Sequence, residues 1–183
     1  ANITFDGSNL STISGPYTQS NGTFTAPSIL TFQNSSSGFT KTGGTFDEGT
    51  GKVIFAGQWN PTINVATTET FYDFEVNKTG GWWMTIAALD TIVVSHNLTL
   101  VDGFILNDGG GTGSITAQGN VTVSSTFDAG TTYPLLFSGS ATQSFDLTGA
   151  TGVYDADISV NKSGGQVNLL SALVMNAASQ DLT

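Results

Sequence analysis

Short motifs recur in the same order in the two halves of this chain, and this internal repetition narrows the possible folds more than any other feature. Residues 76–81 (VNKTGG) return 84 positions later as 160–165 (VNKSGG). Further matched pairs are 2–5 with 97–100, 24–26 with 115–117, 30–32 with 121–123, and 45–50 with 126–131. Ordered self-similarity of this kind is typical of proteins that stack repeated units along one axis.

The matched motifs predict two tandem repeats, residues 1–95 and 96–183, which together form one continuous β array. The offset between matched motifs shrinks from about 95 to 84 residues along the chain. Stacked repeats tolerate such differences in loop length between their strands. The largest difference falls in the loop 34–44, which is rich in Ser and Gly.

Hydrophobic residues alternate with polar ones in short runs along the chain, as in 53–55 (VIF), 98–100 (LTL) and 121–123 (VTV). Alternation with period two and clusters of Gly, Asn and Asp between the runs are typical of short β-strands and turns. Residues 84–89 and 169–178 could be mistaken for helices but lack clear caps. We therefore expect an all-β fold, a β-solenoid resembling a parallel β-helix, with two β-sandwich repeats as the alternative.

Charge and cysteine content exclude several classes of function. The net charge is −10, with only four basic residues, all lysines. Such a chain lacks the basic surface that binds nucleic acids or anionic lipids. No apolar run is long enough to span a membrane, and the absence of Cys excludes a disulfide scaffold.

The order of motifs in residues 45–100 (TFDxGT, VIFxG, TFYxFxVNK[TS]GG, NLTL) resembles the long β-strand repeats of large bacterial surface proteins. The resemblance covers nearly all of the chain. It implies secretion, an extended β-solenoid-like stalk at the cell surface, and a structural or adhesive role. It carries over no catalytic residues, and we expect no enzymatic activity.

The two ends of the chain match the same point of the repeat, and we interpret them as assembly ends. Head-to-tail stacking of β-strands at these ends would build a filament, sheath or stalk, because such a contact does not close. The partner is then another copy of the chain or a neighbouring repeat of a longer protein. The residues at these ends are Asn2, Ile3, Thr4 and Phe5, and Asp181, Leu182 and Thr183.

Three tryptophans suggest a second function, an adhesin or carbohydrate-binding module. Trp59 and Trp82 stand where the second repeat has polar or small residues, and we expect Trp82 to point outward as a contact residue. Trp83 matches the apolar Val167, and we expect it in the core. Exposed indole rings suit recognition of sugars or proteins.

A less favoured hypothesis is an enzyme on a β-helix that acts on polysaccharide. Asp73 with Glu75, and Asp155 with Asp157, are spaced to share one face of a strand, as a pair of catalytic carboxylates would require. Neither pair is reproduced in the other repeat, so the polar face of a strand is the simpler interpretation. The single histidine, His96, has no partners recognisable in the sequence.

The remaining candidate sites are two possible calcium ligands and a set of possible glycosylation sites. We expect no cofactor, although Asp47 and Asp108, in acidic or Gly-rich turns, could supply oxygen ligands to a structural Ca²⁺. Asn-x-Ser/Thr sequons predict possible glycosylation in a secreted protein. They lie at Asn2, Asn9, Asn21, Asn34, Asn77, Asn97, Asn120 and Asn161.

Overall fold

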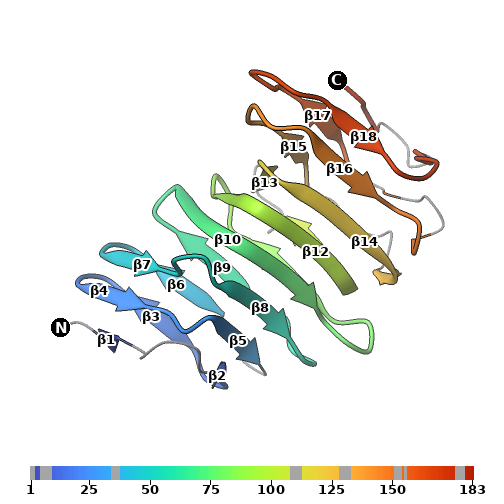
Figure 1. The fold of residues 1–183 in the computed structure, drawn as a ribbon. Coiled ribbons are helices and arrows are strands. Elements are labelled where there is room, and N and C mark those ends of the chain that lie inside the picture. Colours follow the sequence, from blue (N-terminus) through green and yellow to red (C-terminus); the bar gives the residue numbers. More distant parts are fainter. Residues whose placement is uncertain are drawn as a thin grey trace.

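The protein is a β-solenoid in which every strand pairing is parallel and no helix occurs in the described residues. The computed structural model describes residues 3–4, 10–33, 38–107, 113–127, 133–150, 154, 156–175 and 180–183. The chain winds along one axis, and Figure 1 shows its strands stacked from the N-terminal to the C-terminal end. The predicted β-solenoid is confirmed, and the alternative of two β-sandwiches, which would require antiparallel sheets, is wrong.

The strands lie in three rows, one on each side of the solenoid. Row 1 begins with β1 (Ile3–Thr4), β4 (Thr23–Thr25) and β7 (Thr45–Asp47), which form a three-stranded sheet of their own. After this break in the pairing, row 1 contains residues 68–71 of β10 (Thr68–Asn77), residues 91–94 of β12 (Thr91–Asn107), β13 (Ser114–Ala117), β15 (Leu135–Phe137) and β17 (Ile158–Val160). Row 2 contains β2 (Leu10–Ile13), β5 (Ile29–Gln33), β8 (Lys52–Ala56), residues 73–77 of β10, residues 97–102 of β12, β14 (Asn120–Phe127), β16 (Gln143–Asp146) and β18 (Val167–Leu169). Row 3 contains β3 (Tyr17–Gln19), β6 (Phe39–Lys41), β9 (Thr62–Val65), β11 (Trp83–Ile86) and residues 104–107 of β12.

One coil of the solenoid takes 21–24 residues where row 2 is continuous. An inward-facing column in that row shows the spacing, because each of its members pairs with the next. The column consists of Leu30, Val53, Phe74, Leu98, Val121, Phe145 and Leu169. The structural repeat is therefore the coil, which is much shorter than the distance between the matched sequence motifs.

Matched motifs do not all occupy the same row. Leu30 and Val121, which are matched in the sequence, lie in one column four coils apart. Val76, by contrast, lies in row 2, whereas its match Val160 lies in row 1 beside Phe137. The division between residues 95 and 96 falls inside β12. The VNK motif is thus used at two different corners of the cross-section.

The core is a continuous stack of inward side chains, and its first half is built from aromatic rings. Phe32, Phe55 and Phe74 follow one another in row 2, with ring centroids 5.0 Å and 5.6 Å apart. Phe24 and Phe46 stack at 5.3 Å in row 1. Each buried ring contributes about 1.5–3 kcal/mol through burial, and each ring pair about 0.5–1.5 kcal/mol more.

Polar side chains inside the corners tie one coil to another. The Nε2 atom of Gln143 donates to the carbonyl oxygens of Ala117 (2.9 Å) and Gly119 (2.7 Å) on the preceding coil. Gln180 makes the same pair of bonds to the carbonyl oxygens of Tyr154 and Ala156. Because buried carbonyl groups need donors, these glutamines satisfy the backbone where the chain turns.

Candidate assembly ends and surface sites

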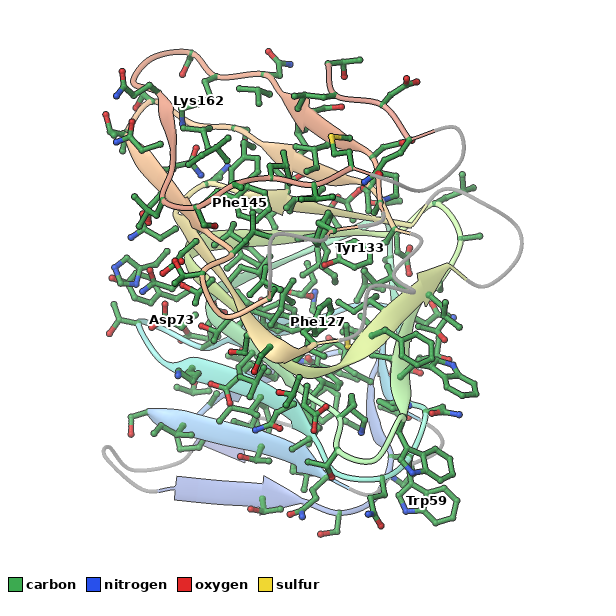
Figure 2. All side chains as sticks on the ribbon, turned by 90° about the vertical axis from the view of Figure 1, so that its right-hand side faces the viewer. Trp59, Asp73, Phe127, Tyr133, Phe145 and Lys162 are labelled. Atoms are coloured by element: carbon green, nitrogen blue, oxygen red, sulfur yellow. The ribbon has the colours of Figure 1, made fainter. Side chains whose placement is uncertain are left out.

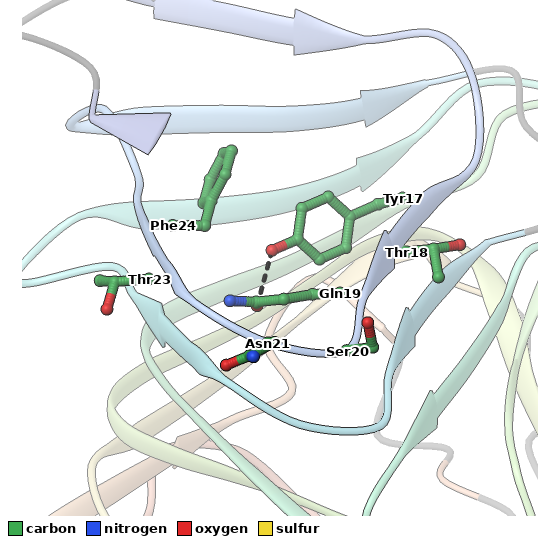
Figure 3. A pocket seen from close by; sticks show the side chains of 7 residues that line it. All are labelled: Tyr17, Thr18, Gln19, Ser20, Asn21, Thr23 and Phe24. Carbon is green, nitrogen blue, oxygen red and sulfur yellow. Dashed lines mark hydrogen bonds between the residues drawn. The ribbon is translucent and has the colours of Figure 1, made fainter. Parts of the chain in front are cut away.

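At the N-terminal end, a hydrogen-bonded pair of polar side chains closes part of the first coil. The hydroxyl of Tyr17 donates to Oε1 of Gln19 (2.8 Å), and Nε2 of Gln19 donates to the carbonyl oxygens of Gly22 (3.1 Å) and Thr45 (2.8 Å). Burial raises the pKa of the Tyr17 hydroxyl, which keeps it protonated as a donor. A cavity of about 320 Å³ lies at this end. Tyr17, Gln19 and Phe24 are among the residues that line it (Figure 3).

The C-terminal end instead exposes the apolar interior of the last described coil. Val160, Leu169 and Leu182 are 45%, 52% and 59% exposed, although Leu169 continues the inward column of row 2. These side chains border a cavity of about 160 Å³ that also contacts Phe145 and Ile158. Exposed apolar clusters of this kind usually mark contact surfaces.

The predicted end residues take part in the strand stack where they are described. Ile3 and Thr4 pair with Phe24 and Thr25, whereas Asn2 and Phe5 lie outside the described residues. Leu182 forms a parallel bridge with Ile158. The backbone N–H of Thr183 donates to the carbonyl oxygen of Ile158 (3.0 Å), and the N–H of Asp181 donates to Oδ1 of Asp157 (2.9 Å).

Strand edges are open at both ends within the part of the chain that the structure describes. β1, β2 and β3 each pair only with the strand of the following coil, namely β4, β5 and β6. At the other end β18 pairs only with β16. Unpaired parallel edges can accept further strands by backbone hydrogen bonding.

Aromatic side chains form a strip on the outside of row 3, which we call the aromatic strip and define as Trp59, Trp82, Trp83 and Phe104. Trp59 and Trp82, on adjacent coils, have ring centroids 6.1 Å apart and tilted by 38°. Trp83 stacks on Phe104 of the next coil at 5.5 Å and 27°. Trp59 is 47% exposed and projects outward in Figure 2, and the other three are partly exposed.

The expectation that Trp83 belongs to the core is wrong. Met84 and Ile86 are the fully buried residues of β11, so the alternation of this strand turns Trp83 outward. Trp82 precedes the strand, after Gly80 and Gly81, which both have a left-handed φ. The turn made by these glycines brings two consecutive tryptophans to the surface. Alternation within β11 alone would have predicted this orientation of Trp83, and nothing in the sequence signalled the contribution of Phe104.

The candidate carboxylates of β10 are each engaged in a separate contact. Oδ1 of Asp73 lies 2.8 Å from Nδ1 of His96 and accepts the backbone N–H of Asn97 (2.9 Å). Glu75 forms an ion pair with Lys52 at 3.0 Å. Their bonds favour a structural role, because each carboxylate links its strand to a neighbouring coil.

Asp157, which lies 84 positions after Asp73 and is therefore its counterpart at the offset of the VNK motifs, makes the same kind of bond. Both carboxylates accept the backbone N–H of a residue 24 positions later, Asn97 for Asp73 and Asp181 for Asp157. Asn120 accepts the N–H of Ser144 in the same manner. These side chains couple consecutive coils at the corners. Asp155, the other member of the second candidate pair, lies outside the described residues.

His96 lies on the surface beside Asp73 and against an aromatic ring. Its ring stacks on Tyr72 with centroids 4.5 Å apart, and its side chain is 50% exposed. The amide of Asn97 also contacts Nδ1 of His96 at 2.8 Å. The residues around this histidine thus form a surface cluster that joins β10 and β12.

Two lysines occupy equivalent positions in the repeated VNK motifs, and the sequence analysis assigned them no role. Nζ of Lys78 donates to the carbonyl oxygen of Ala56 (2.6 Å), and Nζ of Lys162 donates to that of Ser138 (3.2 Å). Lys78 is buried, and desolvation lowers its pKa from 10.5 to about 8. Lys162 is partly exposed and also bonds to Gln143.

The two calcium candidates receive no geometric support within the described residues. Oδ1 of Asp47 accepts the N–H of Gly49 (3.1 Å), which is a bond of the turn itself. Asp108 lies outside the described residues. The described part of the chain contains no group of three or more His, Cys, Asp or Glu residues that could hold a metal ion.

Five of the eight sequon asparagines are described, and all of them reach the surface. Asn21, Asn120 and Asn161 are exposed, and Asn77 and Asn97 are partly exposed. Asn2, Asn9 and Asn34 lie outside the described residues. Glycosylation of these sites stays a prediction.

Comparisons with known proteins found no match to this chain. No protein-family model, no curated protein and no solved structure matches it. The described residues include no helix long and apolar enough to cross a membrane. The functional inference therefore rests on the coils, their ends and the aromatic strip.

Proposed function

We propose that this chain is a structural extracellular protein, a unit of a surface filament, sheath or stalk that joins head to tail by β-strand stacking. The observation that carries the proposal is the exposed interior of the C-terminal coil, where Val160, Leu169 and Leu182 are about half exposed. In this proposal a second copy of the chain, or a neighbouring repeat of a longer chain, supplies the covering coil.

Energetics support a covered C-terminal coil. Leu169 extends a column whose preceding members, from Leu30 to Phe145, are at most 1% exposed. Completing the burial of a leucine contributes up to about 1.5–3 kcal/mol, and several side chains share the surface. Backbone hydrogen bonds along the open edge of β18 would add to this gain.

The direction of the strands determines the kind of assembly. Because all strands are parallel, a further coil stacked on the C-terminal end would present the same kind of edge that β1, β2 and β3 leave open at the N-terminal end. The N-terminal end of one copy can therefore take the place of that further coil on another copy. A contact between these two ends is heterologous and does not close, so it propagates into a fibre.

Composition and surface chemistry support an extracellular location. The chain lacks cysteine, carries a net charge of −10 and resembles secreted bacterial repeats. Such a surface stays soluble through its net charge and does not depend on a reducing environment. Its partner in this proposal is another copy of itself or a neighbouring repeat of a longer chain.

Sedimentation velocity and electron microscopy of the purified chain test the proposal over a range of concentrations. We expect species that grow with concentration into unbranched fibres whose axial repeat equals the length of one chain. A chain that remains monomeric at millimolar concentration overturns self-assembly. In that outcome the C-terminal coil would be covered by other residues of a longer protein.

A further inference from the structure

The aromatic strip combines several features that the core and the coil stacking do not require. Its four rings lie on three successive coils, and their side chains are exposed or partly exposed. The inward side of the same strand is already filled by Met84 and Ile86, which are fully buried. Large aromatic side chains held at the surface usually serve recognition.

The backbone beneath the strip is well anchored. Oδ1 of Asn60 accepts the backbone N–H of Trp83 (3.0 Å), and β11 pairs with β9 and β12 on its two sides. Gly103, at a left-handed φ, passes close over the carbonyl oxygen of Trp82. The rings are therefore carried by a rigid scaffold, which lowers the entropic cost of binding.

The sequence segments that carry the strip are uncharged. Residues 57–66, 79–89 and 103–107 contain no Asp, Glu, Lys, Arg or His, although the chain has 14 acidic residues. Amide and hydroxyl residues adjoin the rings along the chain: Gln58 and Asn60 flank Trp59, and Thr85 lies on the same face of β11 as Trp83. This combination excludes recognition by charge and offers flat apolar faces with neutral hydrogen-bonding groups at their edges.

We propose that the aromatic strip binds an extended neutral polysaccharide. Sugar rings present apolar C–H faces and hydroxyl edges, which match indole faces flanked by amides. Rings on adjacent coils are 5.5–6.1 Å apart, which is of the order of the length of one sugar unit. A chain of sugars lying along the solenoid axis would contact one ring after another.

Binding is tested by affinity electrophoresis of the purified chain in gels that contain hydroxyethylcellulose, galactomannan or, as the anionic comparison, alginate. We expect at least one neutral polysaccharide to retard the chain and alginate to leave it unretarded. The Trp59→Ala/Trp82→Ala double variant should bind at least tenfold more weakly, and Trp82→Phe should keep part of the affinity. Tyr72→Ala, which removes a surface aromatic ring outside the strip, is the matched control.

Circular dichroism and the midpoint of thermal unfolding confirm that each variant is folded. Trp59→Ala alone provides a second variant, because its ring is half exposed and contributes little to packing. Absence of retardation by both neutral polysaccharides, or unchanged retardation of the double variant, overturns the proposal. Loss of a concentration-dependent lateral dimer in the double variant, without polysaccharide binding, would assign the strip to a protein contact instead. Binding or loss of binding by the aromatic strip does not depend on whether the N- and C-terminal ends of the solenoid join head to tail.

Discussion

The two corners built from the VNK motif share a sequence but differ in burial. Lys78 is 1% exposed because a further coil passes over it, and a Cβ placed on Gly103 of that coil would lie 2.5 Å from Cβ of Lys78. Lys162 makes the same bond to a carbonyl one coil earlier, yet it remains partly exposed. The Lys78 corner lies between rows 2 and 3, whereas the Lys162 corner lies between rows 1 and 2. The two corners therefore share the bond from lysine to a carbonyl oxygen but not their place in the cross-section.

The comparison indicates what an interior coil requires. At the Lys78 corner, apolar columns, corner lysine and backbone edges are all covered by the next coil. At the Lys162 corner, Leu169 and Leu182 are exposed although their side chains are suited to an interior. Residues of the C-terminal coil thus have the chemistry of buried residues, and this contrast underlies the proposal of head-to-tail stacking.

The largest expected effect follows from placing charge on the uncovered coil. Leu169→Asp combined with Leu182→Asp should weaken self-association at least about 100-fold, because apolar burial is lost and charges enter the contact. Sedimentation velocity measures the change. Asn168→Asp adds a charge to the outer side of β18 and should associate like the parent chain. Equal association of all three proteins would contradict the role of the C-terminal coil.

Substitution of Gly103, which covers Lys78, should destabilise the fold at this corner. Gly103 has φ +81°, and a Cβ there would also lie 2.4 Å from the carbonyl oxygen of Trp82. Gly103→Ala should lower the free energy of unfolding by about 3 kcal/mol or more, from left-handed strain and overpacking together. Gly81→Ala is the control, since Gly81 has φ +78° and open space around it. Its effect should be about 1–2 kcal/mol by urea denaturation, and similar losses in both variants would argue against a tight corner.

Removing the two lysine side chains compares the corners directly. Lys78→Ala should lower the free energy of unfolding by about 2–4 kcal/mol at pH 7, because a buried stem and a bond to the carbonyl of Ala56 are lost. For the partly exposed Lys162, substitution by Ala should lower it by less than about 1 kcal/mol. Urea denaturation of the unassembled chains provides both values, and the reverse order would contradict the comparison.

The burial of Lys78 also predicts a dependence of stability on pH. The pKa of Lys78 is lowered from 10.5 to about 8, so between these values the unfolded chain binds more protons than the folded chain. Stability from this group therefore rises as the pH increases from about 8 to about 10.5, by on the order of 1–3 kcal/mol. Thermal unfolding of the parent chain relative to Lys78→Met should show this rise. Parallel pH profiles of the two proteins would show that Lys78 is not desolvated.

The fold class could be predicted from the sequence, but the length of the coil could not. Alternating residues and Gly-rich turns were sufficient to predict stacked strands. Members of one column, such as Leu30, Val53 and Phe74, share only their hydrophobic character, so a period of 21–24 residues leaves no visible motif. The two VNK motifs are the clearest match in the sequence, and they predicted a repeat of 84 residues. They lie at different corners of the cross-section, so this spacing is not the structural repeat.

Candidate site residues could be predicted where the residue type alone indicated exposure. They could not be predicted where their role depends on contacts with neighbouring coils. Trp59 and Trp82 were identified because the second repeat has small or polar residues in their place, and they are exposed and partly exposed, respectively. Trp83 was predicted to lie in the core because its match, Val167, is apolar. The two residues lie in different rows, Trp83 in row 3 and Val167 in row 2. The bonds of Asp73 and Asp157 reach residues one coil away, and no local pattern reveals such partners.

Chemical labelling of lysines tests the central claim most directly. The chain is acylated briefly at increasing protein concentration, and the modification of Lys78, Lys162 and the mid-solenoid Lys52 is quantified by mass spectrometry. A second copy that covers the C-terminal coil should reduce the labelling of Lys162 towards the low level of Lys78, while Lys52 stays constant. Labelling of Lys162 that is independent of concentration, with Lys78 protected throughout, would contradict head-to-tail assembly.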